Sequence, residues 1–143
     1  MDTKILFVSL LAVFFTIELH AADRCVAENG TGGCFSSITA AISAAVDGDR
    51  IIIAPKAGNA PYVENLAVNK SLEFHCNTEG SQFVLQGNVT ITPVVDRVVT
   101  FIGMNITTGN ISATVSSPAG PRCVVNIMSC TLGNGYIWFN LNN

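Results

Sequence analysis

Acidic side chains are the first candidates for chemistry, because acid–base catalysis on a polysaccharide needs carboxylates placed close together. An enzyme requires several acids on one face of the fold, so scattered positions of Glu73, Glu79 and Asp96 would argue against catalysis. The acids from residue 47 onward are Asp47, Asp49, Glu64, Glu73, Glu79 and Asp96.

The local patterns around these acids favour structural roles. Asp47 and Asp49 flank a glycine, which is typical of a turn. Glu73 alternates with apolar neighbours, and this predicts a solvated strand face. Asp96 precedes Arg97, and the pair predicts a local ion pair in a turn. We therefore predict no catalytic residue among them.

His75 and Cys76 are adjacent and raise the question of a cysteine–histidine nucleophile. Neighbouring residues in a strand point to opposite faces, so the two are poorly placed for that role. The cysteine spacing also lacks the C-x-x-C pattern of a zinc site. The sequence thus predicts no metal ligand and no cofactor.

Five cysteines lie beyond residue 24. Cys25 and Cys34 flank a glycine-rich segment that lets them meet, and they are the first candidate disulfide. Cys123 and Cys130 are a second candidate pair, which leaves Cys76 over. For Cys76 and Cys130 a buried free thiol is the alternative.

The first 21 residues predict export. Lys4 precedes an apolar run of about 13 residues, shorter than the ~20 that cross a bilayer, and a small residue ends the segment at Ala21. We therefore expect a signal peptide over 1–21 and a secreted or cell-surface protein without a membrane segment in its mature form. A retained anchor or a buried helix is the alternative.

The charge of the chain limits its partners. The net charge is −3, only 12% of the residues are charged, and no run of Lys or Arg occurs. Binding to a phosphate backbone needs such a basic patch, so we expect no nucleic-acid partner.

The remaining chain divides into three parts: a Cys/Gly-rich segment over 22–35, a helix over 36–47 and short strands over 49–143. Ile38, Ala41, Ile42 and Ala45 form one helical stripe. Gly48 is expected to end the helix. Beyond it, short apolar alternations are separated by Gly, Asn, Pro and Ser.

Two strand patterns repeat in this last part. The first starts at Ile51, Leu72, Val99 and Val125, in steps of 21, 27 and 26 residues. The second starts at Leu66, Val89 and Ile111, in steps of 23 and 22 residues. From Val99 the pattern matches the segment from Val125 without gaps at an offset of 26. The repeats predict an all-β solenoid of about four turns with the helix capping its end. An antiparallel β-sandwich is the alternative.

Asparagine recurs at matching places in these turns. Asn65, Asn88 and Asn110 are predicted to form a structural ladder along the solenoid axis. The alternative is glycosylation, since N-x-S/T sequons begin at Asn29, Asn69, Asn88, Asn105 and Asn110.

Three segments resemble a known family. Residues 35–53 are similar to an F-x-x-I-x-x-A-I-x-x-A helix followed by G-D-x-I and a strand, and residues 62–72 match Y-x-E-N-x-x-V-x-K-S-L. Residues 99–106 are similar to later turns. Together they resemble the N-terminal portion of the pectin-lyase-like superfamily, which implies a right-handed parallel β-helix. Its Q-D-T and D-F-x-x-G segments, which pectinesterases use, are absent from this sequence.

The resemblance implies a function as well as a fold. We expect a secreted β-helix domain that presents a stacked surface to a polysaccharide or cell-surface glycan, without catalysis of its own. The alternatives are a pectinesterase- or lyase-like enzyme or its N-terminal fragment, and a structural or adhesin repeat segment. Superfamily members have many more turns, so the turns over 49–143 are expected to be incomplete.

Overall fold

The computed structural model describes residues 21–115 and 120–141. The predicted signal peptide, 1–21, lies outside the described residues except for Ala21. Two short 3-10 segments, Glu28–Gly33 and Ala57–Asn59, interrupt the loops. The main elements are β1 (Asp23–Val26), α1 (Ile38–Ala44), β2 (Arg50–Ile53), β3 (Tyr62–Val63), β4 (Leu66–Val68), β5 (Leu72–Cys76), β6 (Phe83–Gln86), β7 (Val89–Ile91), β8 (Arg97–Ile102), β9 (Met104–Thr108), β10 (Ile111–Val115), β11 (Cys123–Met128), β12 (Thr131–Leu132) and β13 (Ile137–Leu141).

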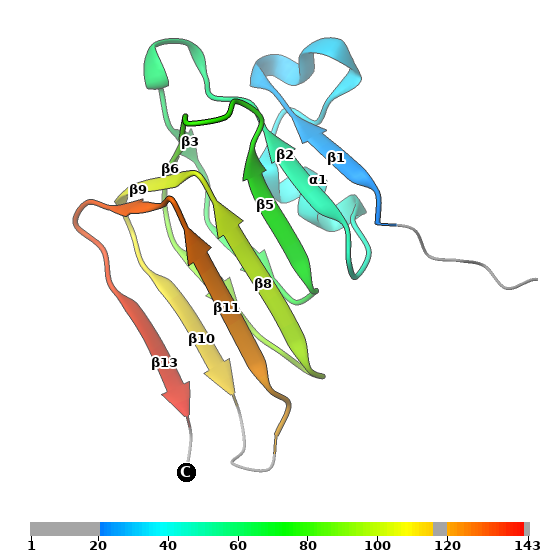
Figure 1. Cartoon of the computed structure of the whole chain (residues 1–143), viewed down its shortest axis with the longest axis vertical. Coiled ribbons are helices and arrows are strands. Elements are labelled where there is room, and N and C mark those ends of the chain that lie inside the picture. Colours follow the sequence, from blue (N-terminus) through cyan, green and yellow to red (C-terminus); the bar gives the residue numbers. More distant parts are fainter. Residues whose placement is uncertain (1–20, 116–119, 142–143) are drawn as a thin grey trace, which may run out of the picture.

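The strands form three parallel sheets (Figure 1). Sheet A has the order β1-β2-β5-β8-β11, sheet B the order β3-β6-β9-β12 and sheet C the order β4-β7-β10-β13. From β2 to β13 the chain passes through A, B and C four times, and each strand pairs in parallel with the strand one turn away. This arrangement is all-β and consistent with a solenoid, and it rules out the antiparallel sandwich.

The strand register confirms most of the predicted repeat. Val99 pairs with Val125 at the offset of 26, and Leu66 pairs with Val89 as the second pattern requires. The first step was wrong by two residues, because Ile51 pairs with Phe74 rather than with Leu72. A shift of two keeps every side chain on the same face of a strand, so the apolar pattern does not distinguish the two registers.

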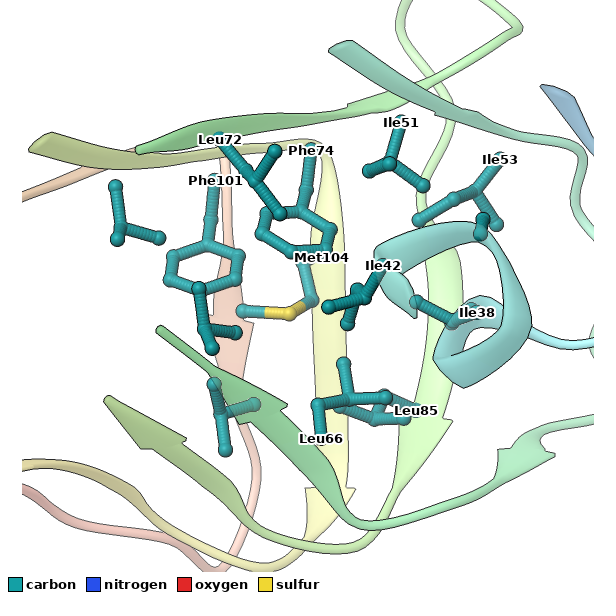
Figure 2. Packing of buried hydrophobic residues seen from close by; sticks show 14 of the residues in the cluster. Ile38, Ile42, Ile51, Ile53, Leu66, Leu72, Phe74, Leu85, Phe101 and Met104 are labelled. Atoms are coloured by element: carbon teal, nitrogen blue, oxygen red, sulfur yellow. The ribbon is translucent and has the colours of Figure 1, made fainter. Parts of the chain in front are cut away.

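The core lies between the three sheets (Figure 2). Inward residues alternate with outward ones, as in β4 and β7, where the two end residues are buried and the middle one is exposed. Phe74 and Phe101, from neighbouring turns of sheet A, stack with ring centroids 4.9 Å apart. Large apolar side chains thus continue from turn to turn, and no single turn has a core of its own.

The N-terminal end of this core is covered by α1, which contacts β1, β2 and β4. Ser37 caps its start by accepting a hydrogen bond from the backbone N–H of Ala40. The helix is shorter than the predicted 36–47, because Ala45 has an extended backbone and a buried side chain. The Cys/Gly-rich segment contains a strand that the sequence did not reveal, since β1 pairs with β2 and extends sheet A.

One of the two candidate disulfides forms. Cys25 and Cys34 are bonded, with their Cα atoms 4.9 Å apart. The pair of Cys123 and Cys130 was wrong, since within the described residues both are free. Cys123 begins β11 and Cys130 follows its end, and at about 3.3 Å per residue an extended strand holds such positions some 20 Å apart. Burial raises the pKa of both thiols, so they stay protonated near neutral pH.

Candidate functional site

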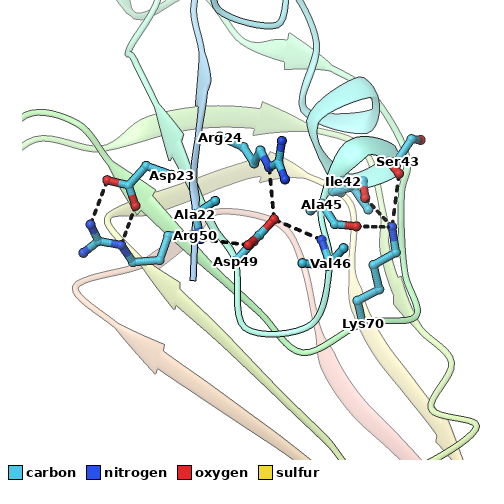
Figure 3. A network of polar contacts seen from close by, with 10 residues as sticks. All are labelled: Ala22, Asp23, Arg24, Ile42, Ser43, Ala45, Val46, Asp49, Arg50 and Lys70. Atoms are coloured by element: carbon cyan, nitrogen blue, oxygen red, sulfur yellow. Dashed lines mark hydrogen bonds and ion pairs between the residues drawn. The ribbon is translucent and has the colours of Figure 1, made fainter. Parts of the chain in front are cut away.

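Asp49 holds the N-terminal edge of the fold together (Figure 3). Its carboxylate is fully buried and accepts hydrogen bonds from the backbone N–H of Ala22 at 2.8 Å, the backbone N–H of Val46 at 3.0 Å and Arg24 Nε at 3.0 Å. Burial alone would raise the pKa of Asp49, but these hydrogen bonds outweigh it and the pKa lies below its ordinary value. The residue is structural, as the turn pattern predicted.

Glu64 is also structural. Its two carboxylate oxygens accept hydrogen bonds from the backbone N–H groups of Ile38 and Thr39, which open α1. Lys70 donates to carbonyl oxygens at the other end of the helix, including that of Ala45 at 2.7 Å (Figure 3). The matched E-N-x-x-V-x-K segment therefore attaches the helix to the first of the four turns.

The predicted ion pair between Asp96 and Arg97 was wrong. Arg97 Nη1 donates instead to Asp47 Oδ2 at 2.6 Å, and Asp96 accepts a hydrogen bond from the backbone N–H of Arg122. Adjacent residues at a strand start point away from each other, so Arg97 bonds to the loop before β2, two turns away, and Asp96 bonds to the residue before β11 in the next turn.

Glu73, Glu79 and Asp96, whose clustering would have indicated catalysis, do not lie together. Asp96 directly precedes β8, whereas Glu79 follows β5, and parallel strands place these positions at opposite ends of sheet A. Glu73 lies on the outer face of β5 and bonds to His75 two residues on. In the described part of the chain no three metal-ligating side chains form a group that could hold an ion.

A cleft of about 740 Å³ lies at the corner where sheet A passes into sheet B. The 77–82 loop forms one side of it and replaces the single-residue corner at Gly103 in the next turn. Gln82 crosses that corner and donates to the carbonyl oxygen of Ser129 at 2.7 Å. His75 and Cys76 both line the cleft, but the structure records no hydrogen bond between them.

A row of asparagines marks the opposite corner, between sheets B and C. We call Asn65, Asn88 and Asn110 the asparagine ladder. Asn65 Oδ1 accepts from the backbone N–H of Asn88 and Asn88 Oδ1 from that of Asn110, both at 2.9 Å. Asn110 Oδ1 accepts from the backbone N–H of Tyr136 at 3.0 Å. Each rung thus joins a side chain to the backbone of the next turn, and no Nδ2 group of the ladder donates within the described residues.

Glycines directly before the ladder make its close spacing feasible. A Cβ atom at Gly109 would lie 2.0 Å from the carbonyl oxygen of Gly87, and one at Gly87 would lie 2.0 Å from that of Glu64. Gly135 repeats this relationship with Gly109. The backbones of successive turns therefore touch at this corner, and no other residue type fits.

Two aromatic side chains follow the ladder in the last turn. Tyr136 is 76% exposed and Trp138 is 65% exposed. Trp138 pairs in register with outward-facing Ser112, so it points away from the core. Trp138 contributes to the lining of two hollows, of about 360 Å³ and 370 Å³.

Sequence reasoning missed both aromatic residues as a site. The signal was present in the gapless match at an offset of 26, which aligns Tyr136 with Asn110 and Trp138 with Ser112. Polar positions of one turn become large aromatic ones in the next. Exposed apolar side chains that gather in one place mark interaction surfaces, and we take the surface formed by Tyr136 and Trp138 as the candidate site.

No protein-family model, curated protein or solved structure matches the chain. Among the described residues there is no helix of the length and apolarity needed to cross a membrane.

Proposed function

We propose that this chain is a secreted right-handed parallel β-helix of the pectin-lyase-like kind that binds a polysaccharide on the outer face of sheet C. The exposed rings of Tyr136 and Trp138 carry the proposal. The face of an aromatic ring is electron-rich, and the C–H groups on one side of a pyranose ring are its natural stacking partners.

The ladder beside these rings supplies the polar half of such a site. Its Oδ1 atoms are used within the fold, so the Nδ2 groups are left to donate to sugar oxygens. Thr90 and Ser112 add hydroxyl groups on the same face. Successive strands repeat these groups every 4.7–4.9 Å or so, which suits an extended polymer.

Binding without turnover fits the placement of the acids better than catalysis does. Glu79 and Asp96 lie at opposite ends of sheet A, and neither belongs to the aromatic surface. The disulfide between Cys25 and Cys34 supports a location outside the cytosol, because such bonds persist in oxidising compartments.

Binding of the purified chain to immobilised polysaccharides, compared with that of Trp138→Ala, tests the proposal. We expect the substitution to weaken binding by roughly tenfold or more. Met128→Ala is the matched control, because it removes a 48% exposed apolar side chain from the outer face of sheet A in the same turn. Equal binding by the wild type and Trp138→Ala, or loss in Met128→Ala alone, would contradict the assignment.

A further inference from the structure

The outer face of sheet C carries no charged side chain among the described residues. Its positions form three columns along the solenoid. They are Asn65, Asn88, Asn110 and Tyr136 in the first, Ala67, Thr90, Ser112 and Trp138 in the second, and Asn69, Thr92 and Thr114 in the third. Amide, hydroxyl, methyl and aromatic groups therefore make up these columns. Glu64 lines a hollow beside Asn65 and Asn88, but its carboxylate is bound to the start of α1.

The cations of the protein lie elsewhere, and most of them are held by contacts within the fold. Seven Lys and Arg residues occur in the sequence, and Lys4 lies outside the described residues, which leaves six. Arg24, Arg50 and Arg97 bind Asp49, Asp23 and Asp47, respectively. Lys70 binds the end of α1, and Lys56 lies over the ring of Tyr62 and donates to the carbonyl oxygen of Pro61.

Arg122 is the one remaining cation of these six, and its side chain has no bonded partner within the described residues. It directly precedes β11 of sheet A and belongs to none of the three columns. A polysaccharide made of uronic acids needs Arg or Lys opposite its carboxylates, and this face provides none. Carboxylates able to hold a bridging divalent cation do not gather there either.

We infer that the ligand of this surface is a neutral polysaccharide, whose hydroxyl or acetamido groups meet the ladder while its rings stack on Trp138 and Tyr136. The inference rests on the proposed function and adds the chemical class of its ligand. The net charge of −3 acts in the same direction, because it repels a polyanion at long range.

Titrations with hydroxyethyl cellulose as a neutral glucan and with polygalacturonate as an acidic polymer test this inference. The wild type should bind the neutral polymer at least about tenfold more tightly. That affinity should change by less than about twofold between about 0.02 M and 0.5 M NaCl, because no ion pair contributes. Trp138→Ala and Tyr136→Ala should each weaken it, and Arg122→Ala should leave it unchanged.

The outcomes separate the inference from the function on which it rests. Preference for polygalacturonate, with binding that weakens in salt and in Arg122→Ala, overturns the neutral ligand but keeps a polysaccharide-binding protein. Binding to neither polymer, nor to an N-acetylated one such as chitin, removes the proposed function itself. Equal binding to the neutral and acidic polymers also overturns the inference, because it shows that charge does not enter recognition.

Discussion

Glu64 and Lys70 lie on either side of β4 and bind the two opposite ends of α1. Glu64 Oε1 accepts from the backbone N–H of Ile38 at 3.0 Å, and Lys70 Nζ donates to the carbonyl oxygen of Ala45 at 2.7 Å. An anion at the start of a helix and a cation at its end both oppose the charges of the helix dipole. A helix of only seven residues is marginal by itself, and these two side chains fix it over the end of the core.

Removing either partner should loosen this cap. Glu64→Gln keeps the shape of the side chain but removes its charge, and Lys70→Met removes the donor. We expect each substitution to lower the free energy of unfolding by about 1–2 kcal/mol, since each removes charge-assisted hydrogen bonds to a helix end. Urea denaturation followed by circular dichroism measures the loss.

Glu79→Gln is the matched control, because Glu79 is exposed on the 77–82 loop and has no hydrogen bond partner within the described residues. Its effect should stay within about 0.5 kcal/mol. If Glu64→Gln is no more destabilising than this control, the contact at the helix start contributes nothing to stability.

Much of the fold could be predicted from the sequence, because successive turns repeat apolar residues at the same inward positions. Val99 and Val125 were aligned correctly from their spacing, and so were Leu66 and Val89. The register at Ile51 was predicted incorrectly, because a shift by two residues leaves the same side chains on the apolar face of the strand. The failure has a physical basis: burial pattern fixes the face of a strand, but only backbone contacts fix its register.

The candidate site was less predictable than the fold. The asparagine positions were identified from repetition, but a rung from Oδ1 to a backbone N–H depends on how closely turns approach, and spacing does not report this. Trp138 is exposed because it occupies an outward position in β13. This position could be assigned only once the pairing of Trp138 with Ser112 was known. The partner of Arg97 was missed because Asp47 lies two turns away in the chain and becomes its neighbour only after folding.

Gly87, Gly109 and Gly135, at the corner between sheets B and C, should be among the positions of the fold that tolerate substitution least. In Gly109→Ala, the new Cβ would lie 2.0 Å from the carbonyl oxygen of Gly87, and backbone cannot move aside as a flexible side chain can. We expect a loss of several kcal/mol, in the range of about 3–5, or failure to fold. Thermal unfolding and the yield of soluble protein report the change.

Gly80→Ala is the control that distinguishes the steric clash at Gly109 from the strain of a positive φ. Gly80 also has a positive φ, of 72°, but nothing lies within 4 Å of the Cβ that would be added. Its replacement should therefore cost only about 1 kcal/mol, the usual penalty for the left-handed conformation. Similar losses at Gly80 and Gly109 would show that turn-to-turn contact is not the reason for glycine at the corner.

Acid should weaken the N-terminal edge through Asp49. Its pKa in the folded state lies below 3.8, the ordinary value expected when the chain is unfolded. A lowered folded-state pKa means that the stabilising contribution is complete above the unfolded-state value and is lost as pH falls through the folded-state value. The contribution of Asp49 to the free energy of unfolding should therefore be constant above about pH 5 and decline below it.

Asp49→Asn isolates this contribution, because the other carboxylates, including Asp23, titrate in both proteins. The variant should be less stable than the wild type at neutral pH, since an amide is a weaker acceptor for Arg24 and for the backbone N–H groups of Ala22 and Val46. Urea midpoints measured from about pH 7 down to about pH 3 should show the difference between the two proteins narrowing as the wild-type carboxylate gains its proton. A difference that stays constant over that range would mean that the charge of Asp49 does not stabilise the fold, and that the hydrogen bonds it accepts are equally well made by a neutral side chain.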